Sequence, residues 1–366
     1  MHSSLYIGLM SGTSLDGIDV ALVDFKSGAS LLHAGRFALP ETLRHTLLQL
    51  SQSNYAISLE QVGQLETALG QAFADAVRQF CQQNIIARKH VRAIGSHGQT
   101  LRHNPNGNLP YTLQMGDANI IAEQTGIATV ADFRRRDVAA GGQGAPLVPA
   151  FHQALFAKPD YTRAIVNIGG IANITLLPTN GKVTGFDTGP GNGLMDAWCQ
   201  KQWQISYDNN GQKSSQGEID HDLLERLMAD PWLQLPAPKS TGRDVFNLDW
   251  LDVFLQHRTI MPENVLCTLN AFTAQTISDA LLATSPTIDE IFVCGGGVHN
   301  AILMQNLQRL CPCPVLSTAT LGVDPDYVEA MAFAWLAKQC IEGKPGNVVE
   351  VTGAKGSRIL GAIYQA

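Results

Sequence analysis

The strongest constraint on the fold is a pattern that the chain contains twice: a strand, a turn with glycines, and two further strands. Apolar alternation predicts these strands at residues 5–9, 18–25 and 31–39 in the first half, and at 163–168, 171–177 and 181–186 in the second half. Helices and strands alternate after each group. Such alternation is typical of α/β folds, so the sequence predicts two α/β domains of related design.

The longer helical patterns fit this organisation. Apolar residues three or four positions apart predict a core helix over 59–80, and further long helices are expected at 262–282 and 326–341. A glycine-rich link follows at 139–144, and we place a domain boundary just before it. The predicted domains are residues 1–133 and 134–366, with the last helix able to pack back on the first domain.

Composition agrees with two domains and excludes several classes of partner. Of 366 residues, 45% are hydrophobic and 16% charged, which suits two cores. The net charge is −7 and the longest basic run is residues 134–136, so no nucleic-acid partner is expected. No apolar run reaches the roughly 18 residues of a membrane span, and no signal peptide is expected. The seven cysteines are scattered and odd in number, which argues against disulfides or a zinc site and favours the cytoplasm.

The common phosphate-binding motifs GxxxxGK[ST] and GxGxxG are absent, so any nucleotide is held by another glycine-rich turn. The first candidate is the hairpin turn within residues 8–19, where successive N–H groups and hydroxyls suit phosphate oxygens. Its candidate ligands are Gly12, Thr13, Ser14, Asp16, Gly17 and Asp19. Asp16 and Asp19 are also the candidates to hold Mg²⁺, through water, because Mg²⁺ keeps much of its hydration. An ordinary hairpin is the alternative, since serine, glycine and aspartate are turn formers.

Two further candidate turns lie in the second half. Asn167, Gly169 and Gly170 belong to a hairpin turn that is the internal counterpart of the first, and a plain turn is again the alternative. Gly295-Gly296-Gly297 joins a strand to a helix. Tight strand–helix packing needs one or two glycines, so three favour a ligand. Three glycines let a flat ring approach the backbone beside an electropositive helix N-terminus.

Two such hairpins followed by a late triple glycine resemble the actin-like ATPase superfamily. Within it, the chain resembles the anhydro-N-acetylmuramic acid kinase family from residue 8 to the last helix, with spacing suited to one full-length enzyme. The matching stretches are GLMSGTSLDGID (8–19), GSHGQT (95–100), ADFRRRDVAAGGQGAPL (131–147), NIGGIAN (167–173), GFDTGPGN (185–192), KSTGRDVF (239–246), VCGGGVHN (293–300) and EAMAFAWL (329–336).

This resemblance implies a two-domain actin-like ATPase (ribonuclease H-like) fold with the nucleotide in an interdomain cleft. There the two hairpins would bind phosphates and the triple glycine adenosine. It also implies an enzyme of bacterial peptidoglycan recycling that uses ATP to open 1,6-anhydro-N-acetylmuramic acid hydrolytically and to phosphorylate it to N-acetylmuramic acid 6-phosphate. A homodimer is expected on the resemblance alone. The alternatives are another actin-like sugar or carboxylic-acid kinase, or a non-enzymatic actin-like ATPase switch.

Two carboxylates are candidates for the chemistry. Ring opening needs a base that takes a proton from water, and we choose Asp187, which is expected to end a strand before a glycine-rich turn. Position alone is equally compatible with a capping role, whereas the resemblance places the catalytic carboxylate here. Glu329 lies near the start of an apolar helix, where the helix dipole favours a glutamate. The resemblance implies that Glu329 contacts a sugar hydroxyl or assists Asp187.

The candidates for sugar binding lie in two other motifs. His97 and Gln99 follow a strand, where a hydrogen bond to the sugar and a local turn contact are equally compatible. Arg134, Arg135 and Arg136 form a basic run of the kind that is commonly a solvated surface. A guanidinium also binds carboxylates bidentately, and the lactyl group of the implied substrate carries one, so we expect one of these arginines to bind it. Lys239 and Arg243 are further candidates for phosphate or substrate contacts.

Overall fold

A computed structural model describes residues 3–12, 15, 17–51, 56–237, 239–242, 245–284 and 287–366. The chain divides into two compact units, of which unit 1 holds residues 1–151 and 327–366 and unit 2 holds residues 152–326. The predicted boundary between residues 133 and 134 falls inside unit 1 instead. The segment after residue 133 stays with unit 1 because the ring of Phe133 lies 5.7 Å from that of Phe333 and the Asp137 carboxylate accepts hydrogen bonds from Asn347 and Thr352.

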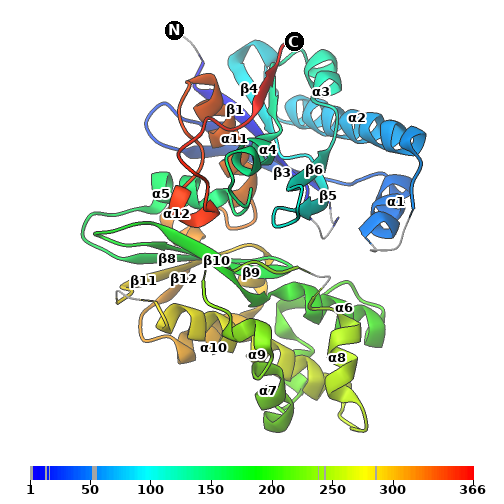
Figure 1. Cartoon of the computed structure of the whole chain (residues 1–366), viewed down its shortest axis with the longest axis vertical. Helices are drawn as coiled ribbons and strands as arrows, with labels where there is room; N and C mark the ends of the chain where they lie inside the picture. Colours follow the sequence, from blue (N-terminus) through cyan, green and yellow to red (C-terminus); the bar gives the residue numbers. More distant parts are fainter. Residues whose placement is uncertain are drawn as a thin grey trace. The chain divides into compact units, whose positions relative to one another are not determined.

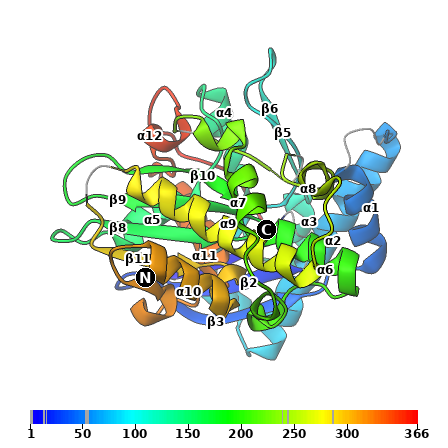
Figure 2. The same ribbon diagram turned by 90° about the horizontal axis from the view of Figure 1, so that it is seen from below.

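Unit 1 is built on a six-stranded sheet with the order β13-β7-β4-β1-β2-β3. Strands β1, β2 and β3 pair antiparallel, β4 and β7 continue the sheet in parallel, and β13 pairs antiparallel with β7. A separate antiparallel hairpin of β5 and β6 is visible in Figure 2. The strands are β1 (Leu5–Met10), β2 (Ile18–Asp24), β3 (Ser30–Phe37), β4 (Val91–Ser96), β5 (Gln99–Asn104), β6 (Tyr111–Met115), β7 (Thr129–Ala131) and β13 (Ala362–Tyr364).

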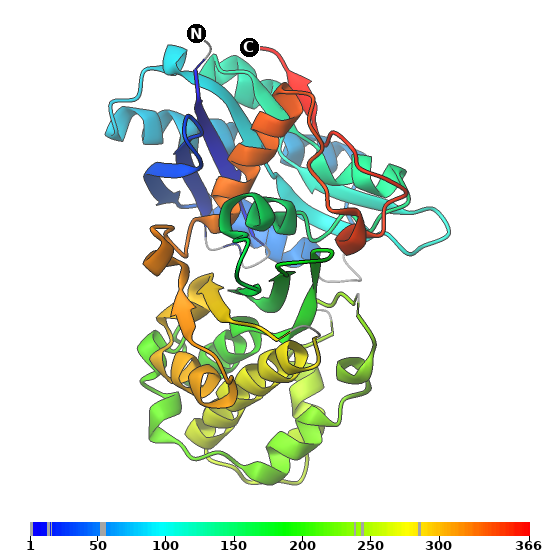
Figure 3. The ribbon, with the colours of Figure 1, turned by 90° about the vertical axis from the view of Figure 1, so that its left-hand side faces the viewer.

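Helices cover both faces of this sheet. Leu69 and Phe73 of α2 join Ile7 and Leu9 of β1 in one buried apolar cluster. Helix α11 packs on the other face, where it contacts β1, β4 and β2; Figure 1 shows its label beside that of β1, and Figure 3 shows it in orange against the blue strands. The helices are α1 (Glu41–Ser51), α2 (Leu59–Gln83), α3 (Ala118–Thr125), α4 (Phe133–Ala139), α11 (Val328–Ile341) and α12 (Val349–Thr352), with α5 (Val148–Phe156) spanning the boundary between the units.

Two glycines explain how close α11 comes to the sheet. A Cβ atom at Gly8 in β1 would overlap the carbonyl oxygen of Ala330, and one at Gly95 in β4 would overlap that of Phe333. Any larger residue would lift the helix off the strands, because backbone atoms cannot move aside as a flexible side chain does. Both glycines lie in the family-like motifs, so part of each motif serves packing.

Unit 2 repeats the sheet of unit 1. Its five-stranded sheet has the order β10-β9-β8-β11-β12, with the first three strands antiparallel and β11 and β12 added in parallel. The strands are β8 (Arg163–Ile168), β9 (Ile171–Leu177), β10 (Thr184–Pro190), β11 (Glu290–Cys294) and β12 (Val315–Ser317). Unit 1 has the same order in β3-β2-β1-β4-β7. This duplicated order confirms the predicted ribonuclease H-like fold class.

The helices of unit 2 bury one large apolar core against its sheet. The long helix α9 supplies Leu266, Phe272 and Ile277 to this core and runs beside α10, as Figure 2 shows. The helices are α6 (Asn192–Trp203), α7 (His221–Met228), α8 (Leu248–Leu255), α9 (Pro262–Leu282) and α10 (Ala301–Leu310). Among the described residues of the whole chain, no helix combines the length and the apolar character that crossing a membrane requires.

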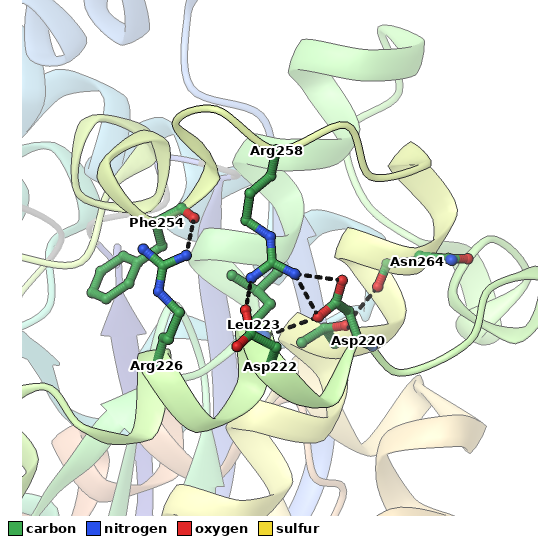
Figure 4. Close-up of polar contacts among 8 residues, drawn as sticks. Asp220, Asp222, Leu223, Arg226, Phe254, Arg258 and Asn264 are labelled. Carbon is green, nitrogen blue, oxygen red and sulfur yellow. Dashed lines mark hydrogen bonds and ion pairs between the residues drawn. The ribbon is translucent and has the colours of Figure 1, made fainter.

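An ion-pair cluster fastens α7 to the loop between α8 and α9 (Figure 4). Arg258 donates to both oxygens of Asp220 at 2.9 Å and also pairs with Asp222. Asp220 caps α7, since its Oδ1 accepts from the backbone N–H of Leu223 at 2.9 Å. One carboxylate therefore serves as helix cap and ion-pair partner together.

Candidate active site

The first glycine-rich turn is held by a side chain from the start of β5. Gln99, which is 2% exposed, accepts from Ser11 Oγ at 2.7 Å and donates to the carbonyl of Gly12 at 3.3 Å. Ser11 Oγ also lies 3.3 Å from the carbonyl of Gly17. Three of the predicted ligands in this turn, Thr13, Ser14 and Asp16, lie outside the described residues. Gln99 thus supports a turn that lies 88 positions earlier in the chain, which is a different contact from the local one within its own turn that the sequence analysis considered.

Asp19, at the start of β2, forms an ion pair with Arg36 of β3. Arg36 Nε donates to Oδ1 at 2.6 Å and Nη2 to Oδ2 at 3.2 Å. The pairing crosses two strands in register, since Asp19 stands opposite Arg36 in the β2–β3 ladder. Both carboxylate oxygens of Asp19, one of the two residues predicted to hold Mg²⁺, therefore accept hydrogen bonds from the guanidinium of Arg36.

Arg134 is the inward-facing member of the basic run. Its Nε donates to His97 Nε2 at 3.0 Å and its Nη1 to the carbonyl of Gly144 at 2.8 Å. Burial lowers the pKa of Arg134 to about 10, and the charges of Glu329 and Asp137 oppose that shift. The guanidinium stays protonated at neutral pH. Arg135 and Arg136 are exposed, and Arg135 pairs with Asp132 at 3.4 Å.

A buried carboxylate holds the loop that positions Arg134. Asp137, which is 0% exposed, accepts from the N–H of Gly144 at 2.8 Å and from the side chains of Asn347 and Thr352, each at 2.8 Å. Because Gly144 in turn accepts from Arg134, Asp137 fixes the guanidinium through the backbone. Sequence reasoning missed Asp137, although it directly follows the three arginines.

Glu329 lies in the first turn of α11, on the same unit as Arg134. Burial raises the pKa of its carboxyl; the positive charge of Arg134 lowers it and the negative charge of Asp19 raises it. These mutual effects place Glu329, Arg134 and Asp19 in one electrostatic neighbourhood. The close packing of α11 on Gly8 and Gly95 fixes where this carboxylate lies.

In unit 2, Asp187 lies inside β10 and not at its end as predicted. It stands opposite Asn173 of β9, and the register shifts by a bulge between Asp187 and Gly189. Its Oδ2 accepts from Ser240 Oγ at 2.8 Å and from the N–H of Thr241 at 2.9 Å. Burial raises the pKa of this carboxyl and the two hydrogen bonds lower it. Asp187 does not cap α6, whose N-cap is Gly191.

The second hairpin turn is tied to the start of α6. The carbonyl of Gly169 accepts from the N–H of Asn192 at 2.7 Å, and that of Gly170 from the N–H groups of Gly191 and Gly193. The side-chain amide of Asn192 also donates to the carbonyl of Ile168 at 3.2 Å. The turn that carries Asn167, Gly169 and Gly170 is thereby fixed to the first residues of the helix.

The triple glycine divides its roles. A Cβ at Gly295 would lie 2.5 Å from Asn167 Oδ1, where φ is also +80°, and a Cβ at Gly297 would overlap the side chain of Ile168. A Cβ at Gly296 meets only Asn192 Nδ2, at the ordinary distance of 3.5 Å. Two of the three glycines therefore serve packing, and Gly296 is the one with space beside it.

The KSTGRDVF stretch (239–246) contacts the Asp187 carboxylate through residues that the sequence analysis did not single out. Ser240 and Thr241 contact Asp187, whereas the predicted Lys239 donates from Nζ to the carbonyl of Leu233 at 2.7 Å. Arg243 lies outside the described residues. The sequence signal for Ser240 was its place in a family-like motif.

Comparison with known proteins accounts for this distribution of motifs. A model of the family described as anhydro-N-acetylmuramic acid kinase matches residues 4–366. The chain belongs to the anhydro-N-acetylmuramic acid kinase family. It is 51% identical to the anhydro-N-acetylmuramic acid kinase of Xylella fastidiosa, covering 99% of this chain and 96% of that protein. It is 50% identical to the Pasteurella multocida protein of the same name, covering 98% and 96%.

Among solved structures, the chain is similar to a ROK family glucokinase from Streptomyces griseus in complex with glucose and AMPPNP, with a TM-score of 0.42 and 13% identity over 92% of this chain and 99% of that one. The predicted family resemblance is confirmed by the match over the whole chain and by the relatives at about half identity.

Proposed function

We propose that this chain is a kinase that opens 1,6-anhydro-N-acetylmuramic acid with water and phosphorylates it at the expense of ATP in peptidoglycan recycling. Full-length similarity to kinases named for that substrate supports the proposal. The structural observation that carries it is the carboxylate of Asp187, which has one oxygen held by two donors and the other without a donor among the described residues. That arrangement suits a general base.

In the proposed reaction, Asp187 takes a proton from water as the water oxygen bonds to the anomeric carbon. The bond between the anomeric carbon and the bridging oxygen breaks, and its electron pair stays on that oxygen, which becomes the acceptor of the phosphoryl group. The carboxylate acts as in an inverting glycosidase. Burial raises its pKa, which makes it a stronger base once ionised.

ATP supplies the γ-phosphoryl group as the second substrate. We propose that the turns at residues 11–17 and 167–170 contact its phosphates and that Gly296 lies against adenosine. The space beside Gly296 fits a flat ring, because a side chain there would point into that space. Gly295 and Gly297 support the turn by packing on Asn167 and Ile168.

Mg²⁺ neutralises phosphate charge in such kinases, and we propose that Asp19 contacts it through water. Both oxygens of Asp19 already face Arg36, which fits a water-mediated contact better than direct coordination. Asp16, the other residue proposed for the metal, lies outside the described residues.

For the sugar, we propose that Arg134 binds the lactyl carboxylate. Two of its five N–H groups contact His97 and Gly144, which leaves further donors on a guanidinium that its neighbours already orient. Glu329 is proposed to contact a sugar hydroxyl. His97 orients Arg134, and Gln99 supports the first turn.

We further propose a cytoplasmic homodimer. Free thiols at all seven cysteines suit a reducing compartment. The dimer rests on the resemblance stated above and is tested by light scattering of the purified protein.

Replacement of Asp187 by asparagine tests the function. The amide keeps the shape but cannot take the proton, so kcat on the anhydro sugar should fall by about a hundredfold to ten-thousandfold. Binding of ATP and sugar should persist, and ring opening and phosphorylation should fall together. Asp249→Asn, at an exposed position in α8, is the matched control and should keep wild-type turnover. Near-normal turnover of Asp187→Asn would remove Asp187 as the base.

A further inference from the structure

Strand β10 is the edge strand of the sheet in unit 2, and residues 239–241 contact it at Asp187. The backbone N–H of Asp187 donates to the carbonyl of Lys239 at 3.0 Å. Ser240 Oγ and the N–H of Thr241 then both donate to Asp187 Oδ2, at 2.8 Å and 2.9 Å. Three successive residues thus contact one aspartate through its backbone and its carboxylate.

The segment is anchored on its other side. Lys239 Nζ donates to the carbonyl of Leu233 at 2.7 Å and lies 4.5 Å from the centre of the Trp232 ring. The ammonium group is therefore held at a carbonyl and over an aromatic face, where a cation is favourable. This anchor keeps the carbonyl of Lys239 and the two donors that follow at fixed positions.

Both donors contact the same carboxylate oxygen. A carboxylate whose Oδ2 accepts two hydrogen bonds is restricted to one rotamer. Its other oxygen, Oδ1, is then the one whose lone pairs can accept a proton or a hydrogen bond from another group. No described residue donates to Oδ1. Catalysis gains from such fixing, because a base must stay within hydrogen-bond distance of the water it deprotonates.

We propose that Ser240 is a positioning residue that, with the N–H of Thr241, fixes the Asp187 carboxylate so that Oδ1 accepts the proton. This inference rests on the proposed role of Asp187 as the base. The hydroxyl also stabilises the ionised form of Asp187 against its burial, since a hydrogen bond donated to a carboxylate lowers the pKa that burial raises.

Substitution of Ser240 is a clean experiment because the residue is exposed, so Ser240→Ala leaves no cavity. Product formation from ATP and the anhydro sugar is measured from pH 5 to 9. Loss of one donor should raise the pKa of Asp187 and so move the acidic limb of the kcat profile toward higher pH. On that limb kcat should fall about three- to tenfold, whereas kcat on the alkaline plateau and both KM values should stay at the wild-type level. Ser240→Thr keeps the hydroxyl and should restore the wild-type profile.

The matched control is Ser215→Ala, an exposed serine of the same unit whose Oγ donates to the carbonyl of Gln212 and to no carboxylate. Its pH profile should be that of the wild type. The positioning role would be overturned if Ser240→Ala had the wild-type dependence of kcat on pH, or if its kcat were lowered equally at every pH. The Asp187→Asn variant separates the two proposals: if it is inactive while Ser240→Ala leaves the acidic limb in place, only the role of Ser240 fails.

Discussion

Arg134 donates from Nε to His97 Nε2 at 3.0 Å, and this one bond determines the state of the histidine. Nε2 accepts, so the proton of the neutral ring lies on Nδ1. Burial, and then the positive charge of Arg134, hold the pKa of His97 well below its usual range. His97 is therefore a neutral acceptor at neutral pH, and in the structure it orients the guanidinium of Arg134.

The first prediction concerns this guanidinium. Arg134→Ala should raise KM for the anhydro sugar by about tenfold to a hundredfold, the effect of losing a hydrogen bond between charged groups, and should change KM for ATP much less. Steady-state kinetics with each substrate varied in turn measure the two values.

Arg136→Ala is the matched control for Arg134, because it removes an exposed arginine from the same helix. It should keep the wild-type KM for the sugar. Equal effects of the two substitutions would mean that the run acts only through its overall charge.

The second prediction separates the glycines of the third turn. Gly296→Val should keep the fold and raise KM for ATP by about tenfold or more, since the side chain fills the space proposed for adenosine. Gly297→Ala should instead lower the free energy of unfolding by about 1–3 kcal/mol, because its Cβ would overlap Ile168. Denaturant unfolding and ATP kinetics on both variants test this, and unchanged ATP affinity in folded Gly296→Val would refute the adenosine assignment.

Much of the fold follows from local patterns. Alternation of apolar residues locates β1 and β2 nearly to the residue, and the three-to-four spacing locates α2, because these signals depend on which face of each element is buried. The predicted end of β10 fell short, since Asp187, Thr188, Gly189 and Pro190 look like a turn in sequence but pair with β9 through a bulge.

The site was less predictable, because its contacts join distant residues. Ser240 lies 53 positions from Asp187, and no local pattern brings them together. The sequence likewise left open which of three arginines faces inward, a matter that depends on how α4 packs. A Cβ atom would overlap backbone at Gly8 and Gly95 and the side chain of Ile168 at Gly297, so these motif glycines serve packing, and only the structure reveals the neighbours responsible.

The third prediction concerns the ion-pair cluster of Figure 4. Arg258→Ala should lower the free energy of unfolding by about 1–2 kcal/mol, because Asp220 loses its partner while it still caps α7. Asp222→Ala removes the more exposed partner and should cost at most about 0.5 kcal/mol. Urea unfolding measures both, and the Arg258 effect should shrink in 1 M salt; equal costs for the two variants would contradict this account.

The last prediction links pH to stability through His152, a buried histidine of α5 that is 1% exposed. Its Nδ1 lies 2.9 Å from Thr175 Oγ1, and burial lowers its pKa to about 3. The unfolded chain takes up a proton near pH 6.5 and the folded chain does not, so stability is present above that pH and is lost as the pH falls toward 3. Between pH 7 and 5 the free energy of unfolding should fall by about 2 kcal/mol for this reason.

His152→Gln should remove that part of the acid sensitivity, whereas His45→Gln, at an exposed position, should leave it intact. Urea unfolding at the two pH values gives the difference for each protein. If wild type and His152→Gln lose equal stability on acidification, the proton uptake responsible for the loss belongs to other groups.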